Sequence, residues 1–341
     1  MGADNLIEPR PMHRFDEDVL NAHLERELDG YSGPLKVQQF EGGQSNPTFL
    51  LTTPSGRYVL RKKPPGDLLP SAHAVEREYR LYKALEQTDV TVPKTYLLCE
   101  DSSILGTPFF IMEYLEGRVF KDSALSDESP EDRKDIYYDM IRVLAALHSV
   151  DYKEVGLETY GKPGNYFVRQ TGRWTKQYLA AQTHDIPSMN SLIQWLHDNM
   201  LEDDTTSIVH GDYQLYNMMF HETEPRCIAV LDWELSTLGN PMADLAYNSM
   251  KYHEVINGKR FEPTDGIPGE SEIVELYCRL TGKQNIENWN FCLAFSFFRL
   301  ASICQGVYKR GLDGNASSAS ALQMKGKVTD CADAAWKIAN R

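Results

Sequence analysis

The sequence predicts an α+β protein with two lobes, a small antiparallel-sheet lobe over residues 1–115 and a larger, mainly helical lobe over residues 116–341. Short runs of alternating apolar residues, typical of strands, end near Tyr114. A polar segment follows, and from Pro130 onward apolar residues recur at the three- and four-residue spacing of a helix. Because the pattern changes across this polar link, we expect the boundary between the lobes near residue 115.

A turn that contains two glycines, Glu41-Gly-Gly-Gln-Ser-Asn-Pro47, separates the first two predicted strands, residues 35–40 and 48–52. Strand, turn and strand together indicate a β-hairpin. Gly42 and Gly43 lack side chains, so backbone N–H groups of this turn could approach a phosphate group closely. An ordinary hairpin turn is the alternative, since the segment is not a G-x-G-x-x-G motif.

The next predicted strand, Tyr58-Val-Leu-Arg61, ends in basic residues. A protein kinase carries its phosphate-pairing lysine at the end of such a strand. Alternation places Arg61 on the same face as Val59 and Lys62 on the opposite face. We therefore expect Arg61 to contact phosphate, with Lys62 as the second choice and a solvated basic strand end as the alternative.

Residues 72–85 are expected to form a helix, because apolar residues recur at i, i+4 and i+7 from Val75. Glu76 and Glu78 lie on this helix, and one of them is expected to pair with the basic residue of the strand. For either residue, a carboxylate on the protein surface is the alternative.

Two further strands are predicted at residues 95–99 and 108–114. The second ends at Glu113 and Tyr114. In a kinase layout, backbone N–H and C=O groups at this point bind the edge of adenine. Backbone recognition needs no particular side chain, so this prediction rests on position alone.

The segment His210-Gly-Asp-Tyr-Gln-Leu-Tyr-Asn217 has the spacing H-x-D-x-x-x-x-N of a kinase catalytic loop. An apolar run, residues 227–231, then leads into Asp232-Trp-Glu234, the layout of a strand that ends in a metal-binding Asp. Such a short motif also occurs by chance, but the strand that follows favours a functional site. The role of Glu234 stays open between the surroundings of the metal and the start of a helix.

Phosphoryl transfer requires an acceptor hydroxyl placed in line and neutralisation of the phosphate charge. Asp212 can accept the hydroxyl proton, which makes it the predicted catalytic base. Asn217 and Asp232 offer the oxygen ligands that Mg²⁺ prefers. His210 is expected to brace the loop backbone and Asp244 to anchor it through buried hydrogen bonds, rather than to contact substrate.

The aromatic residues of the helical part have two interpretations. Trp174, Tyr178 and Trp195 lie at helix-compatible intervals, and several phenylalanines follow Trp289. They could form a wall of the substrate site, although packing in the core is the usual role of such residues. Residues 257–270, rich in Gly and Pro, are predicted as a surface loop that could act as a lid.

Composition excludes several classes of function. Lys and Arg number 35 and Asp and Glu 49, a net charge of −14, which argues against a nucleic-acid partner. Six cysteines without a C-x-x-C motif indicate reduced thiols and a cytoplasmic location. The N-terminus is too polar for a signal peptide. The apolar residues 291–303 are interrupted by Arg299 and too few to span a bilayer, so we expect no membrane partner.

Several stretches carry a family resemblance: Gly42-Gly-Gln-Ser-Asn-Pro-Thr-Phe49, Tyr58-Val-Leu-Arg-Lys-Lys-Pro-Pro-Gly66, Arg77-Glu78, His210-Gly-Asp212 with Asn217, and Val230-Leu-Asp-Trp-Glu-Leu-Ser-Thr-Leu-Gly239. In these stretches the chain resembles the aminoglycoside phosphotransferase and choline kinase superfamily. It is most similar to the kinase-like domain of acyl-CoA dehydrogenase family 10 and 11 proteins.

The resemblance implies a protein-kinase-like fold that uses ATP and Mg²⁺. It implies that Asp212 is the catalytic base, that Asn217 and Asp232 bind the metal, and that Arg61 pairs with Glu78. The residues predicted to bind the nucleotide are Gly42, Gly43, Ser45, Asn46, Arg61, Glu78, Glu113 and Tyr114.

The dehydrogenase-fused members imply a small-molecule acceptor, the hydroxyl of a hydroxyacyl-CoA or hydroxy acid, and a functional link to an acyl-CoA dehydrogenase. Gln214 and Tyr216 replace the Arg and Asp that fused members tend to carry beside the substrate. An aminoglycoside or choline-type kinase and a nucleotide-binding pseudokinase are the alternatives.

Overall fold

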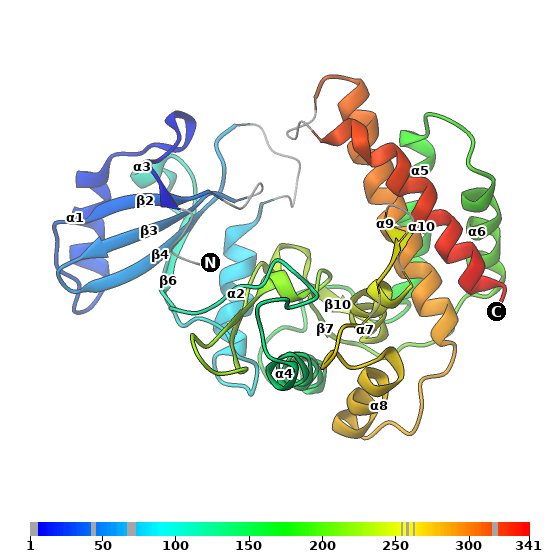
Figure 1. Cartoon of the computed structure of the whole chain (residues 1–341). Coiled ribbons are helices and arrows are strands. Elements are labelled where there is room, and N and C mark those ends of the chain that lie inside the picture. The colour runs from blue at the N-terminus through cyan, green and yellow to red at the C-terminus, as the bar shows by residue number, and fades with distance from the viewer. Residues whose placement is uncertain are drawn as a thin grey trace. The chain divides into compact units, whose positions relative to one another are not determined.

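The structure, a computed structural model, describes residues 6–41, 46–66, 73–253, 255–256, 259–261, 263–315 and 320–341 (Figure 1). The chain divides into two compact units that are discontinuous in sequence. Unit 1 consists of Met1–Leu125, Lys153–Glu158 and Leu215–Leu235, and unit 2 consists of Ser126–Tyr152, Thr159–Gln214 and Ser236–Arg341. This division is not a single cut in the sequence, and the lobe boundary at residue 115 stays a prediction.

An antiparallel sheet of six strands forms the centre of unit 1, in the order β1-β2-β3-β4-β6-β5 (Figure 1). It contains every strand that the sequence predicts before residue 115, and a short N-terminal strand in addition. The strands are β1 (Leu6–Ile7), β2 (Lys36–Phe40), β3 (Thr48–Thr53), β4 (Gly56–Lys62), β5 (Thr95–Cys99) and β6 (Phe109–Glu113).

The two faces of this sheet carry different layers, because successive side chains of a strand point to opposite faces. On one face, Phe49 and Phe109 belong to an apolar core with Leu20 of helix α1. On the other face, Phe110 contacts Tyr82 of helix α2, with 6.0 Å between the ring centroids. The helices and the 3-10 turn of this part are η2 (Pro11–His13), α1 (Glu17–Glu27), α2 (Val75–Leu85) and α3 (Ser102–Leu105).

A second strand pair, β8 (Met218–Phe220) and β9 (Cys227–Val230), also belongs to unit 1. Arg118 and Phe220 exchange two backbone hydrogen bonds of 2.8 Å, and the Val230 N–H donates to the Thr91 carbonyl at 2.9 Å. A Cβ on Gly117 would lie 2.3 Å from the Phe220 carbonyl oxygen, so only glycine fits beside this strand. These backbone bonds explain why residues far apart in sequence form one compact unit.

Helices dominate unit 2, as the sequence predicts. The N-cap Ser129 accepts a hydrogen bond from the Asp132 N–H at 3.1 Å, which starts the first long helix where the capping motif places it. Figure 1 shows α9 and α10 side by side, with α5 and α6 next to them. The helices are α4 (Pro130–Ser149), α5 (Tyr166–Ala181), α6 (Pro187–Asp198), α7 (Met242–Ser249), α8 (Glu270–Thr281), α9 (Trp289–Leu312) and α10 (Met324–Ala339).

Helix α9 is long and apolar enough to cross a membrane by length and composition, which corrects the expectation that this stretch is too short. The correction arises because the helix continues beyond the apolar residues 291–303 at both ends. Within the structure, 72% of its most apolar window is buried, as in the core helix of a globular protein.

Short elements complete unit 2. Strands β7 (Ser207–Val209) and β10 (Thr237–Gly239) form an antiparallel pair, and β11 (Val255–Ile256) pairs with β12 (Lys259–Arg260). The predicted loop at residues 257–270 therefore begins within a short hairpin, and part of it lies outside the described residues. The remaining 3-10 turns are η3 (Leu215–Asn217) and η4 (Trp233–Leu235) in unit 1 and η5 (Met250–Tyr252) and η6 (Ala321–Gln323) in unit 2.

Candidate active site

A buried ion pair between β4 and α2 forms the centre of the site in unit 1. The Arg61 Nε donates to Glu78 Oε2 at 2.6 Å, and Nη2 donates to Oε1 at 3.3 Å. Arg61 is 4% exposed and Glu78 is 2% exposed. The bidentate geometry fixes the plane of the guanidinium, which a single contact would leave free to rotate.

Polar side chains from the end of the first hairpin complete this pair. The Asn46 Nδ2 donates to Glu78 Oε1 at 2.8 Å, and Arg61 Nη1 donates to Thr48 Oγ1 at 3.3 Å. Asn46 thus reaches the predicted nucleotide site through Glu78. Gly42, Gly43 and Ser45, predicted to cover the phosphates, lie outside the described residues.

Burial and neighbouring charges act in opposite directions on this pair. Burial opposes the charge of Arg61, but the carboxylates of Glu78 and Asp232 outweigh it and raise the pKa of the guanidinium. Burial raises the pKa of Glu78, and the Arg61 charge and the hydrogen bond from Asn46 act against that rise. Lys62, the second choice of the sequence, points to the other face of β4, where burial lowers its pKa.

The strand pair β8–β9 places the two predicted metal ligands at one end of a ladder. Met218 pairs with Val230, and the Leu231 N–H donates to the Asn217 carbonyl at 2.8 Å. Asn217 and Asp232 are therefore neighbours across the strands. Asp232 has a positive φ of 60°, which ends the extended strand and redirects the carboxylate.

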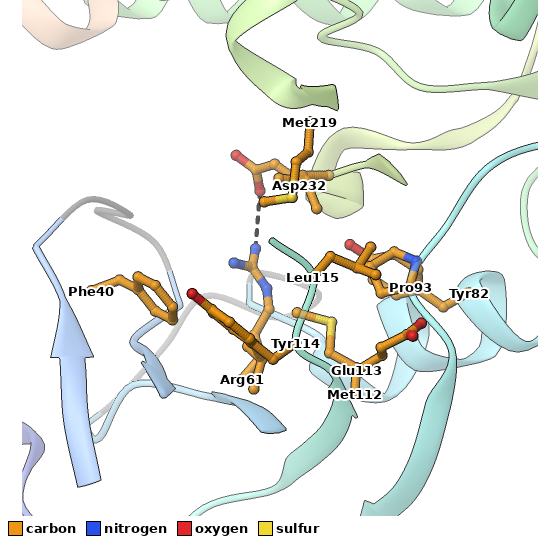
Figure 2. Close-up of a pocket in the computed structure, with 12 residues that line it drawn as sticks. Phe40, Arg61, Tyr82, Pro93, Met112, Glu113, Tyr114, Leu115, Met219 and Asp232 are labelled. Carbon is orange, nitrogen blue, oxygen red and sulfur yellow. Dashed lines mark hydrogen bonds and ion pairs between the residues drawn. The ribbon is translucent and has the colours of Figure 1, made fainter. Parts of the chain in front are cut away.

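Arg61 reaches Asp232 as well as Glu78. Its Nη2 donates to Asp232 Oδ1 at 2.9 Å, and the Asp232 side chain is 39% exposed (Figure 2). Of the described residues, none donates a hydrogen bond to Asp232 Oδ2. A partly exposed carboxylate with one available oxygen, at the same end of the strand pair as Asn217, fits a divalent cation with hard oxygen ligands.

Groups of three or more His, Cys, Asp or Glu side chains with metal-ligand geometry are absent from the described part of the chain. Mg²⁺ needs no such group, since it is usually held by one or two protein oxygens, with phosphates and water as the other ligands.

An apolar pocket lies next to Arg61 and Asp232 in unit 1 (Figure 2). Glu113 and Tyr114, which the sequence predicts to bind the nucleotide, line this pocket, and so does Leu115, which the sequence analysis did not name. The Glu113 N–H already donates to the Lys94 carbonyl at 2.8 Å. Of the described residues, none accepts from the Leu115 N–H. The other lining residues are Phe40, Val59, Tyr82, Pro93, Met112, Met219 and Leu231.

The predicted catalytic loop begins in unit 2, where Asp244 holds its backbone. The His210 N–H donates to Asp244 Oδ2 at 2.6 Å, and the Gly211 N–H donates to Oδ1 at 2.8 Å. The Asp212 N–H contacts His210 Nδ1 at 3.2 Å. His210 and Asp244 therefore brace and anchor the loop, as expected from the sequence.

Asp244 is ionised in this position. Burial would raise its pKa, but hydrogen bonding and charge from His148, the charge of His210 and the Gly211 N–H hold it below the usual range. Asp212 lies in unit 2, whereas Asn217 and Asp232 lie in unit 1. The role of Asp212 as the base opposite these ligands stays a prediction.

Residues 36–255 match the phosphotransferase enzyme family. The chain belongs to this family. A Ralstonia eutropha protein of known structure, provisionally assigned as an aminoglycoside phosphotransferase, is 50% identical, with a TM-score of 0.88 over 96% of this chain and 99% of that one. The predicted α+β, bilobal, protein-kinase-like fold is confirmed by this similarity.

The curated relatives are longer proteins. Acyl-CoA dehydrogenase family member 10 of Mus musculus is 47% identical over 100% of this chain and 33% of its own length. Family member 11 of Homo sapiens is 42% identical over 100% of this chain and 45% of its own length. The chain thus spans about a third to just under half of these relatives, and the resemblance to them is confirmed.

More distant structures share the fold. The aminoglycoside phosphotransferase APH(4)-Ia in complex with AMP-PNP and hygromycin B is 16% identical, with a TM-score of 0.62 over 94% of this chain and 98% of that one.

Proposed function

We propose that this phosphotransferase is an ATP- and Mg²⁺-dependent kinase that transfers the γ-phosphate to the hydroxyl of a small molecule. The observation that carries the proposal is the arrangement of Arg61, which is held by Glu78 on one side and reaches Asp232 on the other, beside an apolar pocket. Solved relatives of the same fold bind ATP or AMP-PNP together with an antibiotic.

Different residues bind the base and the phosphates of the nucleotide. The apolar pocket accepts the base, and the Leu115 N–H is the donor that can bind its edge. Arg61 binds phosphate oxygens, since Glu78 fixes its plane and leaves part of its donor fork facing Asp232. The predicted turn at Gly42, Gly43 and Ser45 covers the phosphates with backbone N–H groups.

Asn217 and Asp232 would hold Mg²⁺, which neutralises the charge of the transferred phosphate. The Arg61 contact to Asp232 would then be replaced by contacts to phosphate, because a carboxylate oxygen shared with a cation is a poorer acceptor. Asp212 accepts the hydrogen of the acceptor hydroxyl and orients its oxygen. Asp244 keeps this loop rigid through two backbone hydrogen bonds.

The favoured acceptor is a hydroxyacyl-CoA or a hydroxy acid. The support is the identity of 42% and 47% to proteins named for acyl-CoA dehydrogenases, which suggests a shared acyl substrate and a functional link to such an enzyme. We also infer action in the cytoplasm, with neither nucleic acid nor membrane as a partner.

A second candidate is an aminoglycoside kinase, since the Ralstonia eutropha relative carries that provisional assignment at 50% identity. Its substrate would be a polycation, which requires acidic side chains around the acceptor hydroxyl.

ADP release distinguishes these candidates. Purified protein with ATP and Mg²⁺ is tested against hydroxyacyl-CoAs, free hydroxy acids, choline and aminoglycosides. We expect turnover with a hydroxyacyl compound and a loss of about 10²–10⁴-fold in kcat for Asp212→Asn. Glu222→Gln, at an exposed carboxylate in the turn between β8 and β9, serves as the control. Unchanged turnover in Asp212→Asn would contradict the proposed base, and turnover of aminoglycosides alone would favour the second candidate.

A further inference from the structure

Arg299 of helix α9 is a buried cation that no acidic residue in the described part of the chain neutralises. The residue is 8% exposed. Its Cζ lies 5.9 Å from the ring centroid of Trp174 on α5 and 5.2 Å from that of Tyr247 on α7. Among the residues that the structure describes, none forms an ion pair with the guanidinium or accepts a hydrogen bond from it.

A buried charge without a partner is unfavourable, and arginine cannot avoid the cost by releasing its proton. The aromatic faces attract the cation, but they offer no acceptor for its N–H groups. The donor fork of Arg299 is therefore available to an anion that is not part of the chain.

A second arginine beside this position is also incompletely satisfied. Arg169 Nη2 donates to the Lys162 carbonyl at 2.6 Å, while Nη1 is buried without a partner in the described structure. Arg169 and Arg173 follow Tyr166 by three and seven residues, so all three share one face of α5. The Tyr166 ring lies 6.4 Å from that of Phe295 on α9, centroid to centroid, and α5 packs against α9 (Figure 1).

The charges of all three guanidinium groups affect the pKa of the Tyr166 phenol. Burial raises its pKa, the positive charge of Arg299 acts against that rise, the carboxylate of Asp244 adds to it, and the charges of Arg169 and Arg173 also act against it. Around this buried phenol three guanidinium groups outnumber one carboxylate, that of Asp244, which already accepts from the His210 and Gly211 N–H groups, although the whole chain carries a net charge of −14.

This region connects to the predicted catalytic loop within unit 2. The Gln214 side chain donates to the Tyr247 carbonyl at 3.1 Å. Gln214 follows Asp212 by two residues, and the ring of Tyr247 faces Arg299. Tyr247 therefore contacts both the loop that contains Asp212 and the Arg299 guanidinium.

We propose that Arg299, with Trp174 and Tyr247, binds an anionic group of the phosphate acceptor, either a carboxylate or a phosphate. This inference rests on the proposed function and deepens it, because it defines the acceptor as an anion. An Arg fork binds either group through two parallel hydrogen bonds. The same positive charge repels an aminoglycoside or choline, so the site selects against cationic acceptors.

Binding measurements without nucleotide test the site. The full chain is titrated calorimetrically with hydroxyoctanoate, with its coenzyme A thioester and with its pantetheine thioester, which has neither carboxylate nor phosphate. We expect Arg299→Met to weaken at least one anionic ligand by about ten- to a hundredfold and to leave the neutral thioester unchanged. Loss for the free acid alone identifies a carboxylate, and loss for the coenzyme A thioester alone identifies a phosphate.

Arg299→Lys keeps the charge without the planar fork, so its affinity should lie between those of the wild type and Arg299→Met. Arg310→Met, an exposed arginine on the same helix, is the matched control and should bind like the wild type. The proposal is overturned if the wild type binds neither anionic ligand at millimolar concentration, if Arg299→Met and Arg299→Lys both bind like the wild type, or if all three ligands weaken equally.

These outcomes are separate from those of the proposed function. A chain that binds the anions through Arg299 but releases no ADP with any acceptor would contradict the kinase proposal and leave the anion site established. A chain that phosphorylates an acceptor equally well after Arg299→Met would contradict the anion site alone.

Discussion

Two buried arginines, one in each unit, differ in whether a carboxylate lies beside the guanidinium. Arg61 in unit 1 has Glu78 in bidentate contact and Asp232 at 2.9 Å. Arg299 in unit 2 has two aromatic rings and, among the described residues, no acid in ion-pair contact. A guanidinium whose N–H groups already bind carboxylates is held in one orientation and can position a ligand. A guanidinium without such partners keeps its N–H donors for an incoming anion.

Lys251 extends the comparison to a cation that can lose its charge. Its Nζ lies 4.2 Å from the ring centroid of Tyr137 and 5.4 Å from that of Tyr252. Burial lowers its pKa to about 7, a response that arginine does not have. The three cations should therefore respond differently to substitution and to pH.

The largest effect on stability is expected for the buried ion pair Arg61–Glu78. Glu78→Ala leaves the Arg61 guanidinium buried with only the partly exposed Asp232, so the free energy of unfolding should fall by about 3–5 kcal/mol. Urea denaturation measures the change. The exposed pair Arg57–Glu116, at 2.7 Å, is the control, and Glu116→Ala should cost less than about 1 kcal/mol. Equal losses for the two variants would show that the burial of Arg61 has no energetic weight.

The next effect is a pH dependence at Lys251. Its folded pKa of about 7 lies below the ordinary value of 10.5, so between these values the unfolded chain binds more protons and stability rises with pH. Relative to Lys251→Met, the wild type should gain up to about 1.4 kcal/mol per pH unit between pH 7 and 9. Urea denaturation of both proteins at the two pH values measures the difference. Parallel behaviour of the two proteins would contradict a neutral Lys251.

The smallest effect on stability is expected for Arg299, which forms no ion pair with a described residue. Arg299→Met removes the cation–π contacts and also the unpaired charge, so the free energy of unfolding should change by less than about 1 kcal/mol, in either direction. Thermal and urea unfolding measure it. A loss as large as that of Glu78→Ala would place Arg299 among the structural residues and remove the contrast between the two arginines.

Much of the nucleotide site followed from sequence because its signals are local. Strand alternation alone separates Arg61 from Lys62, and the structure places only Arg61 against Glu78. The positions of the strands β2 to β6 along the chain and the start of α4 after Ser129 were also predicted, since short-range periodicity and capping act over a few residues.

Other features of the site depend on contacts between distant segments. The Leu115 N–H is available, whereas the Glu113 N–H donates to the Lys94 carbonyl. This difference depends on how the segment that contains Lys94 packs beside β6. Asp232 reaches Arg61 through a backbone with φ of 60°, which strand periodicity does not predict.

The sequence by itself determined the fold class, the family and the residues whose spacing along one segment defines a phosphotransferase, from His210 to Asp232. Only the tertiary structure decided which charges are paired. Arg61 lies at the basic end of a strand and Arg299 lies within an apolar helix, and neither local pattern indicates whether an acid lies beside the guanidinium. The physical reason is that neutralisation requires an acid brought within about 3–4 Å by packing, and this depends on segments far apart in the chain.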